Sequence, residues 1–197
     1  MLFAQSTNAD GSKYQFKKIV QLDATPVQSQ GQTGTCWSFS ATSFFESEIQ
    51  RLGAKTPVIL SEMYVVRKAY ELKAEKYIRM DGKINFGEGG AFHDAPLVIS
   101  KFGIVPYEVY TGLNGKDTYN HAELFTQLNA VMNDVLARLG SPEGVSDEWK
   151  RKYNSILDYG MGKDVVDFEL NGKRYTPQTY AASLGLDMKN YVSLTSF

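Results

Sequence analysis

The stretch Gln30-Gly31-Gln32-Thr33-Gly34-Thr35-Cys36-Trp37-Ser38-Phe39-Ser40 decides the reading of this sequence, because it contains the only cysteine of the chain. After Cys36, apolar residues recur at spacings of three and four as far as Leu52, and Gly53 follows as a left-handed stop. This pattern predicts a central helix from Cys36 to Leu52, which we expect to be the longest buried helix. Its aromatic stripe of Trp37, Phe39, Phe44 and Phe45 is expected in the core. The cysteine therefore lies where a loop gives way to a helix.

A cysteine at the start of a helix is well placed to act as a nucleophile. Unpaired amides and the positive end of the helix dipole stabilise a thiolate, which is the reactive form of the side chain. Gln30, six residues earlier, can donate a side-chain amide hydrogen to an oxyanion, together with the backbone N–H of Cys36, so we expect its side chain to fold back towards the sulfur. Lone cysteines are usually inert core residues, but the combination with Gln30, the glycines and Trp37 favours catalysis.

The segment resembles the nucleophile region of papain-like cysteine peptidases. Three further segments, given at the end of this paragraph, follow in the order in which that family has them. Three later segments are similar to the bleomycin hydrolase and aminopeptidase C subfamily, especially its bacterial members. Where secreted papain-type enzymes commonly carry a second cysteine, this chain has Thr33, so no disulfide can form within it. The family segments are Leu60-Ser61-Glu62-Met63-Tyr64, Gly87-Glu88-Gly89-Gly90 and Lys101-Phe102-Gly103-Ile104-Val105-Pro106, and the subfamily segments are Lys173-Arg174-Tyr175-Thr176-Pro177, Leu184-Gly185-Leu186 and Tyr191-Val192-Ser193-Leu194-Thr195-Ser196.

The resemblance implies a peptide-binding cleft beside the cysteine. Gly89 and Gly90 would run along it and pair with the substrate backbone as an added strand, which requires residues without bulky side chains. Ala91 and Phe92 would help to wall the pocket for the side chain next to the scissile bond. A glycine cluster before a helix is by itself usually only a loop, so these roles rest on the resemblance.

The catalytic base is not apparent in the sequence. A cysteine nucleophile needs an imidazole and a group, often Asn, that orients it, and in papain-like chains both lie ~130 residues or more downstream. His93 and His121, the only histidines, follow Cys36 by 57 and 85 residues and are expected at helix starts, where a charged ring is disfavoured. We assign neither a catalytic role and expect the amino-terminal portion of a longer enzyme, inactive alone.

Two classes of function are consistent with these residues. The resemblance implies a cysteine peptidase of aminopeptidase type, acting through an acyl-enzyme, in which a carboxy-terminal arm of the full enzyme docks the free amino group. The alternative is a non-catalytic interaction module on a papain-like half-fold, which altered residues at Cys36 or Gln30 would have favoured. Expected partners are a peptide substrate, the missing carboxy-terminal half and, through an uncovered cleft face, a second copy as a homo-oligomer.

Composition excludes several other classes. The 197 residues are 43% hydrophobic, which allows one or two compact domains with a core. The 21 basic and 22 acidic residues lack the positive excess that nucleic-acid binding needs. No apolar run approaches the ~20 residues of a membrane span. No companion ligands surround the histidines, so neither a metal nor a cofactor is expected. Location stays open between the cytoplasm and, if Leu2 to Gln5 is a signal-peptide remnant, the periplasm or exterior.

Turn and cap residues predict an α+β, mainly helical fold with one small β-hairpin. A helix capped by Ser61 runs to about Met80, and the others run from near Phe92 to Gly103, from Asn120 to before Gly140, and from Trp149 to Gly160. Asn171-Gly172 turns a hairpin and Thr176-Pro177 opens a short helix. We expect a signal remnant or linker at 1–16, the papain-like left lobe at 17–110, and a subfamily insertion at 111–197, with a hinge at Ser141-Pro142-Glu143-Gly144.

Overall fold

The computed structural model describes residues 23–139 and 146–192, together with the isolated residues 11, 13, 19, 20 and 194. It is mainly helical with one small antiparallel hairpin, as the sequence predicts. The predicted hinge and most of the predicted linker lie outside the described residues. The elements are α1 (Cys36–Arg51), α2 (Glu62–Arg79), α3 (Asp94–Phe102), α4 (Ala122–Arg138), α5 (Glu148–Met161), β1 (Phe168–Leu170), β2 (Lys173–Tyr175), α6 (Pro177–Ser183) and the 3₁₀ helix η1 (Met188–Asn190).

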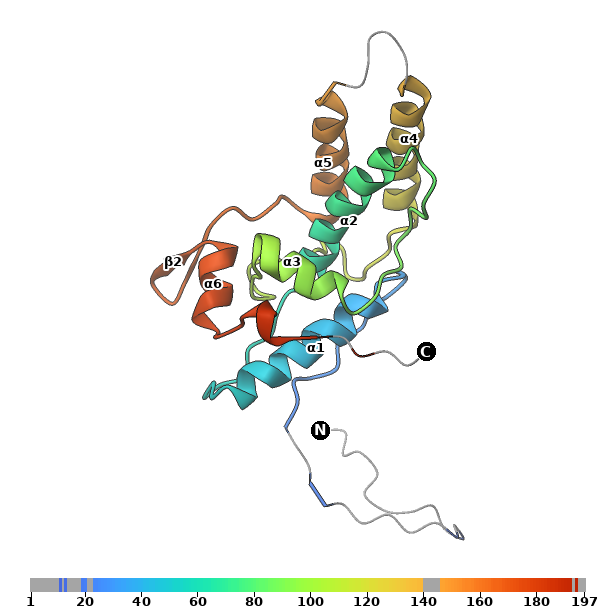
Figure 1. Ribbon diagram of the computed structural model, residues 1–197. Helices are drawn as coiled ribbons and strands as arrows, with labels where there is room; N and C mark the ends of the chain where they lie inside the picture. Colours follow the sequence, from blue (N-terminus) through green and yellow to red (C-terminus); the bar gives the residue numbers. More distant parts are fainter. Residues whose placement is uncertain are drawn as a thin grey trace.

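Helix α2 is the centre of the fold. It lies alongside α4 and α5, while α1 crosses below it and α3 packs against both α1 and α2 (Figure 1). Every residue from Glu62 to Tyr70 is buried, because neighbouring helices cover α2 on several sides. The expectation that Cys36 opens the longest buried helix is therefore half right. Cys36 does open α1, but α2 has 18 residues against 16, and α1 leaves Phe44 42% exposed.

Most helix and hairpin boundaries follow from local signals. The Ser61 hydroxyl accepts a hydrogen bond from the Tyr64 N–H at 3.0 Å and caps α2. Thr176 and Thr179 form a reciprocal capping box at the start of α6. Asn171 and Gly172 have φ values of 51° and 73°, the left-handed pair that a two-residue hairpin turn requires. These three predictions are confirmed.

The predicted start of α4 and the predicted end of α5 are each wrong by one or two residues, for reasons that the packing shows. Helix α4 begins at Ala122 with His121 as its N-cap, and the Asn120 side chain instead accepts a hydrogen bond from the Ala122 N–H at 3.0 Å. Helix α5 continues through Gly160 and ends at Met161, with Gly162 as its C-cap residue at a φ of 92°. A Cβ on Gly160 would lie 2.7 Å from Leu124 of α4. This glycine therefore permits close helix packing and does not end the helix.

Two carboxylates are buried where α1 meets the start of α2. Glu46 accepts hydrogen bonds from the Leu60 N–H, at 2.8 Å, and from the Thr25 hydroxyl. Glu62 is 3% exposed, and its main-chain carbonyl accepts a hydrogen bond from Ser38 of α1. Burial, with a smaller contribution from the charge of Glu46, raises the pKa of the Glu62 carboxyl from 4.5 to about 7. The folded state therefore holds this proton more tightly than the unfolded chain does.

The raised pKa of Glu62 gives a testable dependence of stability on pH. Its contribution to the free energy of unfolding is complete below pH 4.5 and is lost as pH rises through 7. Relative to Glu62→Gln, the wild type should lose roughly 3 kcal/mol between pH 4.5 and pH 8, measured by urea unfolding. His121 titrates in both proteins and cancels in the comparison. Glu123→Gln is the control, because Glu123 is exposed in the first turn of α4, and its free energy of unfolding should change with pH as the wild type's does. If the curve of Glu62→Gln also runs parallel to that of the wild type, the raised pKa of Glu62 is contradicted.

Candidate active site

Cys36 is the first residue of α1, and its side chain is exposed. Thr35 precedes it as the N-cap residue, and the Thr35 carbonyl accepts the Ser38 N–H at 2.9 Å. The side chains that follow Cys36 anchor the helix below it, since Trp37 is 5% exposed and Phe45 is fully buried. The thiol thus lies at the open end of a fixed helix, where the N-terminal amides and the helix dipole favour an anion.

The loop before Cys36 is docked onto a segment far along the chain. The Gln32 N–H donates to the Tyr119 carbonyl at 2.8 Å, and the Asn120 side chain donates to the Gln32 side chain at 2.7 Å. Gly31 has a φ of 58°, and a Cβ there would lie 2.6 Å from the Tyr119 carbonyl oxygen. Gly31 is therefore the residue that lets this loop approach the start of α4.

Gln30 is hydrogen-bonded within the same loop. Its side-chain amide donates to the Thr33 carbonyl at 2.5 Å, and the Thr33 hydroxyl donates back to the Gln30 carbonyl at 2.9 Å. We expected Gln30 to fold towards the sulfur of Cys36, and the described hydrogen bonds instead direct it to Thr33. A glutamine amide has two N–H donors, so one donor is engaged in the loop. The oxyanion role of Gln30 remains a prediction.

The glycine loop 87–90 lies against the segment that carries Cys36. The Trp37 indole N–H donates to the Glu88 carbonyl at 3.0 Å, and the Gly34 N–H donates to the Glu88 carboxylate at 2.8 Å. A Cβ on Gly90 would lie 2.7 Å from the Trp37 ring, so this position needs glycine for packing. Gly89 and Gly90 are exposed, as a strand that pairs with substrate must be.

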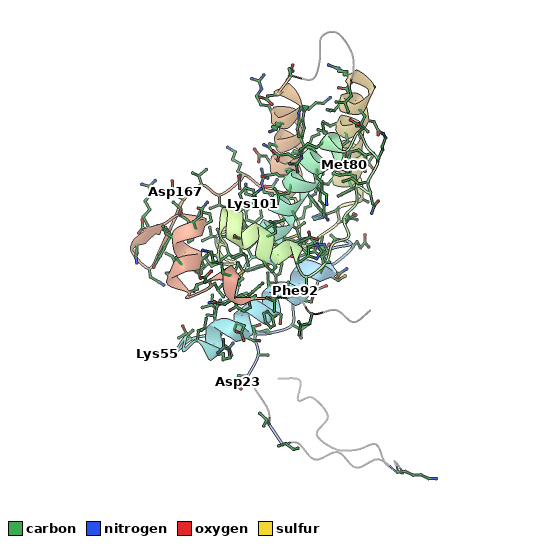
Figure 2. All side chains as sticks on the ribbon, viewed as in Figure 1. Asp23, Lys55, Met80, Phe92, Lys101 and Asp167 are labelled. Atoms are coloured by element: carbon green, nitrogen blue, oxygen red, sulfur yellow. The ribbon has the colours of Figure 1, made fainter. Side chains whose placement is uncertain are left out.

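Phe92 and Ala91 differ in their surroundings. Ala91 is exposed, and its N–H donates to the Asp94 carboxylate at 2.9 Å. Phe92 is half-buried and lies over α1 (Figure 2). Its ring stacks on Phe45 with centroids 5.8 Å apart and meets Phe44 edge to face. The predicted aromatic core of α1 thus holds for Trp37 and Phe45, whereas Phe39 is half-buried and Phe44 stays partly exposed. The pocket-wall role of Ala91 and Phe92 remains a prediction.

The two histidines lie in different environments. His121 is 2% exposed, with its Nδ1 atom 3.1 Å from the Tyr70 hydroxyl and 3.9 Å from the Glu88 carboxylate. Burial, assisted by the charge of Lys116, lowers the pKa of His121 to about 4, so the ring is neutral near pH 7. His93 is exposed, 3.8 Å from Asp94. Neither ring makes a hydrogen bond to Cys36 among the interactions of the described residues.

In the described ranges no three His, Cys, Asp or Glu side chains are grouped so that they could hold a metal ion. Among the helices at 36–138 and 148–190, none is both long and apolar enough to cross a membrane.

Glu88 and Lys73 contact the segments around Cys36, and sequence analysis assigned a role to neither of them. For Glu88, its place inside the glycine motif was the only sequence signal. Lys73 comes from the middle of α2 and reaches the carbonyls of Gly87 and Gly89. No pattern in the linear sequence points to it, because the contact depends on how α2 packs against the loop.

Comparison with known proteins identifies the class. A family model described as the papain family cysteine protease matches residues 12–125, which is more than half of the chain. The chain therefore belongs to the papain family of cysteine proteases. Aminopeptidase C of Lactococcus lactis subsp. lactis (strain IL1403) is 23% identical over 212 residues, and aminopeptidase C of Lactobacillus delbrueckii subsp. lactis is 26% identical over 216 residues. Each match covers 89% of this chain and 47% of the relative.

A solved structure supports the same fold. PepW from Lactobacillus rhamnosis HN001 matches with a TM-score of 0.63 and 20% sequence identity, covering 87% of this chain and 46% of that chain. The resemblance to the aminopeptidase C branch of the papain family is thus confirmed. The chain spans about half the length of these relatives.

Proposed function

We propose that this chain supplies the nucleophile half of a cysteine peptidase of the aminopeptidase C type. The observation that carries the proposal is the exposed thiol of Cys36 at the first position of α1, beside a glycine loop that packs on Trp37. The family match and the aminopeptidase C relatives support the same assignment. The substrate class is a peptide or aminoacyl amide with a free amino terminus.

In the proposed reaction, the Cys36 thiolate attacks the carbonyl carbon of the scissile bond. The N–H of Cys36 and the Gln30 side chain donate hydrogen bonds to the oxyanion that forms. The C–N bond then breaks, and an imidazolium gives its proton to the leaving amine, which leaves a thioester on Cys36. Water, deprotonated by the same imidazole, attacks the thioester and releases the carboxylic acid and the thiol.

We infer that this imidazole and the Asn that orients it come from sequence outside these 197 residues. His121 is buried against Tyr70, and His93 is exposed beside Asp94. A base must lie within hydrogen-bond reach of its proton in a plausible pose, and neither ring meets that requirement in the described contacts. The partner is therefore the rest of the same enzyme. We further propose a boundary near Thr111, with α4 and α5 as an insertion packed on α2.

The test compares this chain with the longer protein that contains it. The chain alone should not hydrolyse aminoacyl-coumarin substrates, whereas the longer protein should hydrolyse them and should reject N-acetylated versions. Cys36-dependent turnover by the chain alone would overturn the inference about the base. An inactive longer protein would overturn the peptidase assignment and favour a non-catalytic module.

A further inference from the structure

We propose that Glu88 and Lys73 are positioning residues that hold the glycine loop 87–90 in register with Cys36. This inference rests on the proposed function, because it concerns the strand expected to pair with substrate. Each side chain joins the loop to a different part of the chain. Glu88 connects it to the nucleophile segment, and Lys73 connects it to α2.

Glu88 contacts the nucleophile segment on both sides of the cysteine. Its carboxylate accepts the N–H of Gly34, two residues before Cys36, and its carbonyl accepts the indole N–H of Trp37, one residue after it. Behind it, His121 lies 3.9 Å from the carboxylate in a neutral form. A hydrogen bond to an ionised acceptor is stronger than one between neutral groups. The distance between the glycine loop and the thiol is thereby fixed.

Lys73 fixes the orientation of the peptide groups in the loop. Its ammonium donates to the carbonyl of Gly89 at 2.5 Å and to that of Gly87 at 3.3 Å, and lies 5.2 Å from the centroid of the Trp37 ring. A trans peptide is planar, so holding the Gly89 carbonyl towards α2 directs the Gly90 N–H to the opposite side. No hydrogen bond among the described residues uses the Gly90 N–H, which leaves this donor for a substrate carbonyl.

The loop needs such restraints because of its composition. Three of its four residues are glycines, which lose more conformational freedom on ordering than any other residue. The single cysteine of the chain excludes a disulfide between this loop and the nucleophile segment. Burial lowers the pKa of Lys73, and the charges of Asp94 and Glu88 oppose that shift. Those two acidic groups therefore help to keep the ammonium charged.

The first experiment measures loop order in this chain, independently of catalysis. Hydrogen–deuterium exchange should accelerate in peptides covering 87–91 in Lys73→Met, and in those covering both 31–36 and 87–91 in Glu88→Leu. Exchange in peptides from the middle of α4 should not change. Lys76→Met is the matched control, because Lys76 lines the same cavity of about 360 Å³ beside the loop but is exposed. Unchanged exchange at 87–91 in Lys73→Met would overturn the proposal.

The second experiment measures substrate positioning in the longer peptidase. Lys73→Met should raise KM for aminoacyl substrates about 10- to 100-fold, the range for losing a hydrogen bond from a charged donor. The rate at which iodoacetamide labels Cys36 should stay within about twofold of the wild-type rate, because that reagent does not bind to the glycine loop. Lys73→Arg and Glu88→Gln keep a donor and an acceptor respectively, and should restore most of the activity.

The outcomes separate the two proposals. If kcat/KM and iodoacetamide labelling fall together in Lys73→Met, the residue has only a general structural role and the positioning proposal is wrong. If KM is unchanged, it is wrong as well. If Cys36→Ser leaves hydrolysis intact, the proposed function fails, and the exchange experiment still decides whether Lys73 and Glu88 order the loop.

Discussion

If this chain supplies the nucleophile half of an aminopeptidase as proposed, replacement of Cys36 by serine is expected to lower kcat/KM for aminoacyl substrates at least about 1,000-fold in that longer protein. A serine hydroxyl at this position is not ionised near neutral pH, whereas the thiolate is the attacking form of cysteine. The helix dipole and the unpaired amides at the start of α1 would remain, so they cannot compensate for the lost nucleophile. Steady-state kinetics at substrate concentrations above and below KM measure the effect.

Ser40 provides the control on the same helix. It is exposed, and its hydroxyl donates to the Trp37 carbonyl at 3.2 Å. Ser40→Ala should therefore change kcat/KM by less than about twofold. Because Cys36 is exposed, Cys36→Ser should also leave the midpoint of urea unfolding nearly unchanged. Residual activity of Cys36→Ser above a tenth of the wild type would mean that another group is the nucleophile.

Local signals predicted the parts of the fold that depend on neighbouring residues. Ser61 caps α2, Asn171-Gly172 turns the hairpin, and Gly53, with a φ of 105°, follows α1. Each of these effects arises within a few residues of the chain, so it is visible in the sequence. The position of Cys36 at the start of α1 belongs to the same group, because the apolar period of α1 begins directly after it.

The features that could not be predicted depend on contacts between distant segments. Gly160 reads as a helix end, but Leu124 packs against it from α4. No sequence pattern predicts the contact of Lys73 with the glycine loop, because that contact depends on how α2 packs against the loop. In each case the environment is set by tertiary packing, which the linear pattern does not encode.

A large loss of stability at neutral pH is expected on replacement of Arg67, a buried cation that links α2 to α5 and the segment after it. Its guanidinium is 2% exposed and donates to the Gly162 carbonyl at 2.8 Å and to the Asp158 carboxylate at 2.7 Å. Its Nε atom also lies 3.5 Å from Glu71 and 3.8 Å from Asp164. One side chain therefore lies within 4 Å of three carboxylates, which belong to α2, to α5 and to the segment after α5.

Arg67→Met should lower the free energy of unfolding by roughly 3 kcal/mol, the lower end of the cost of breaking a buried ion pair. The lower end applies because Asp158 and Asp164 are 42% and 35% exposed and can regain water, and because Lys68 still lies 2.5 Å from Asp164. The Gly162 carbonyl would lose its bond to Arg67, which removes a restraint on the end of α5. Urea unfolding at neutral pH measures the change.

Arg138 is the control for this test, because it forms an ion pair that is exposed and not buried. It pairs with Asp134 at 3.0 Å, but the two side chains are 64% and 48% exposed. Arg138→Met should therefore cost less than about 1 kcal/mol, as exposed pairs do. Similar costs for the two substitutions would show that burial does not strengthen the Arg67 interactions. A much larger cost for Arg67→Met than for Arg138→Met would support the dependence of α5 docking on this buried cation. The Arg67–Asp158 and Arg138–Asp134 distances are similar, at 2.7 and 3.0 Å, so pair length would not explain the difference.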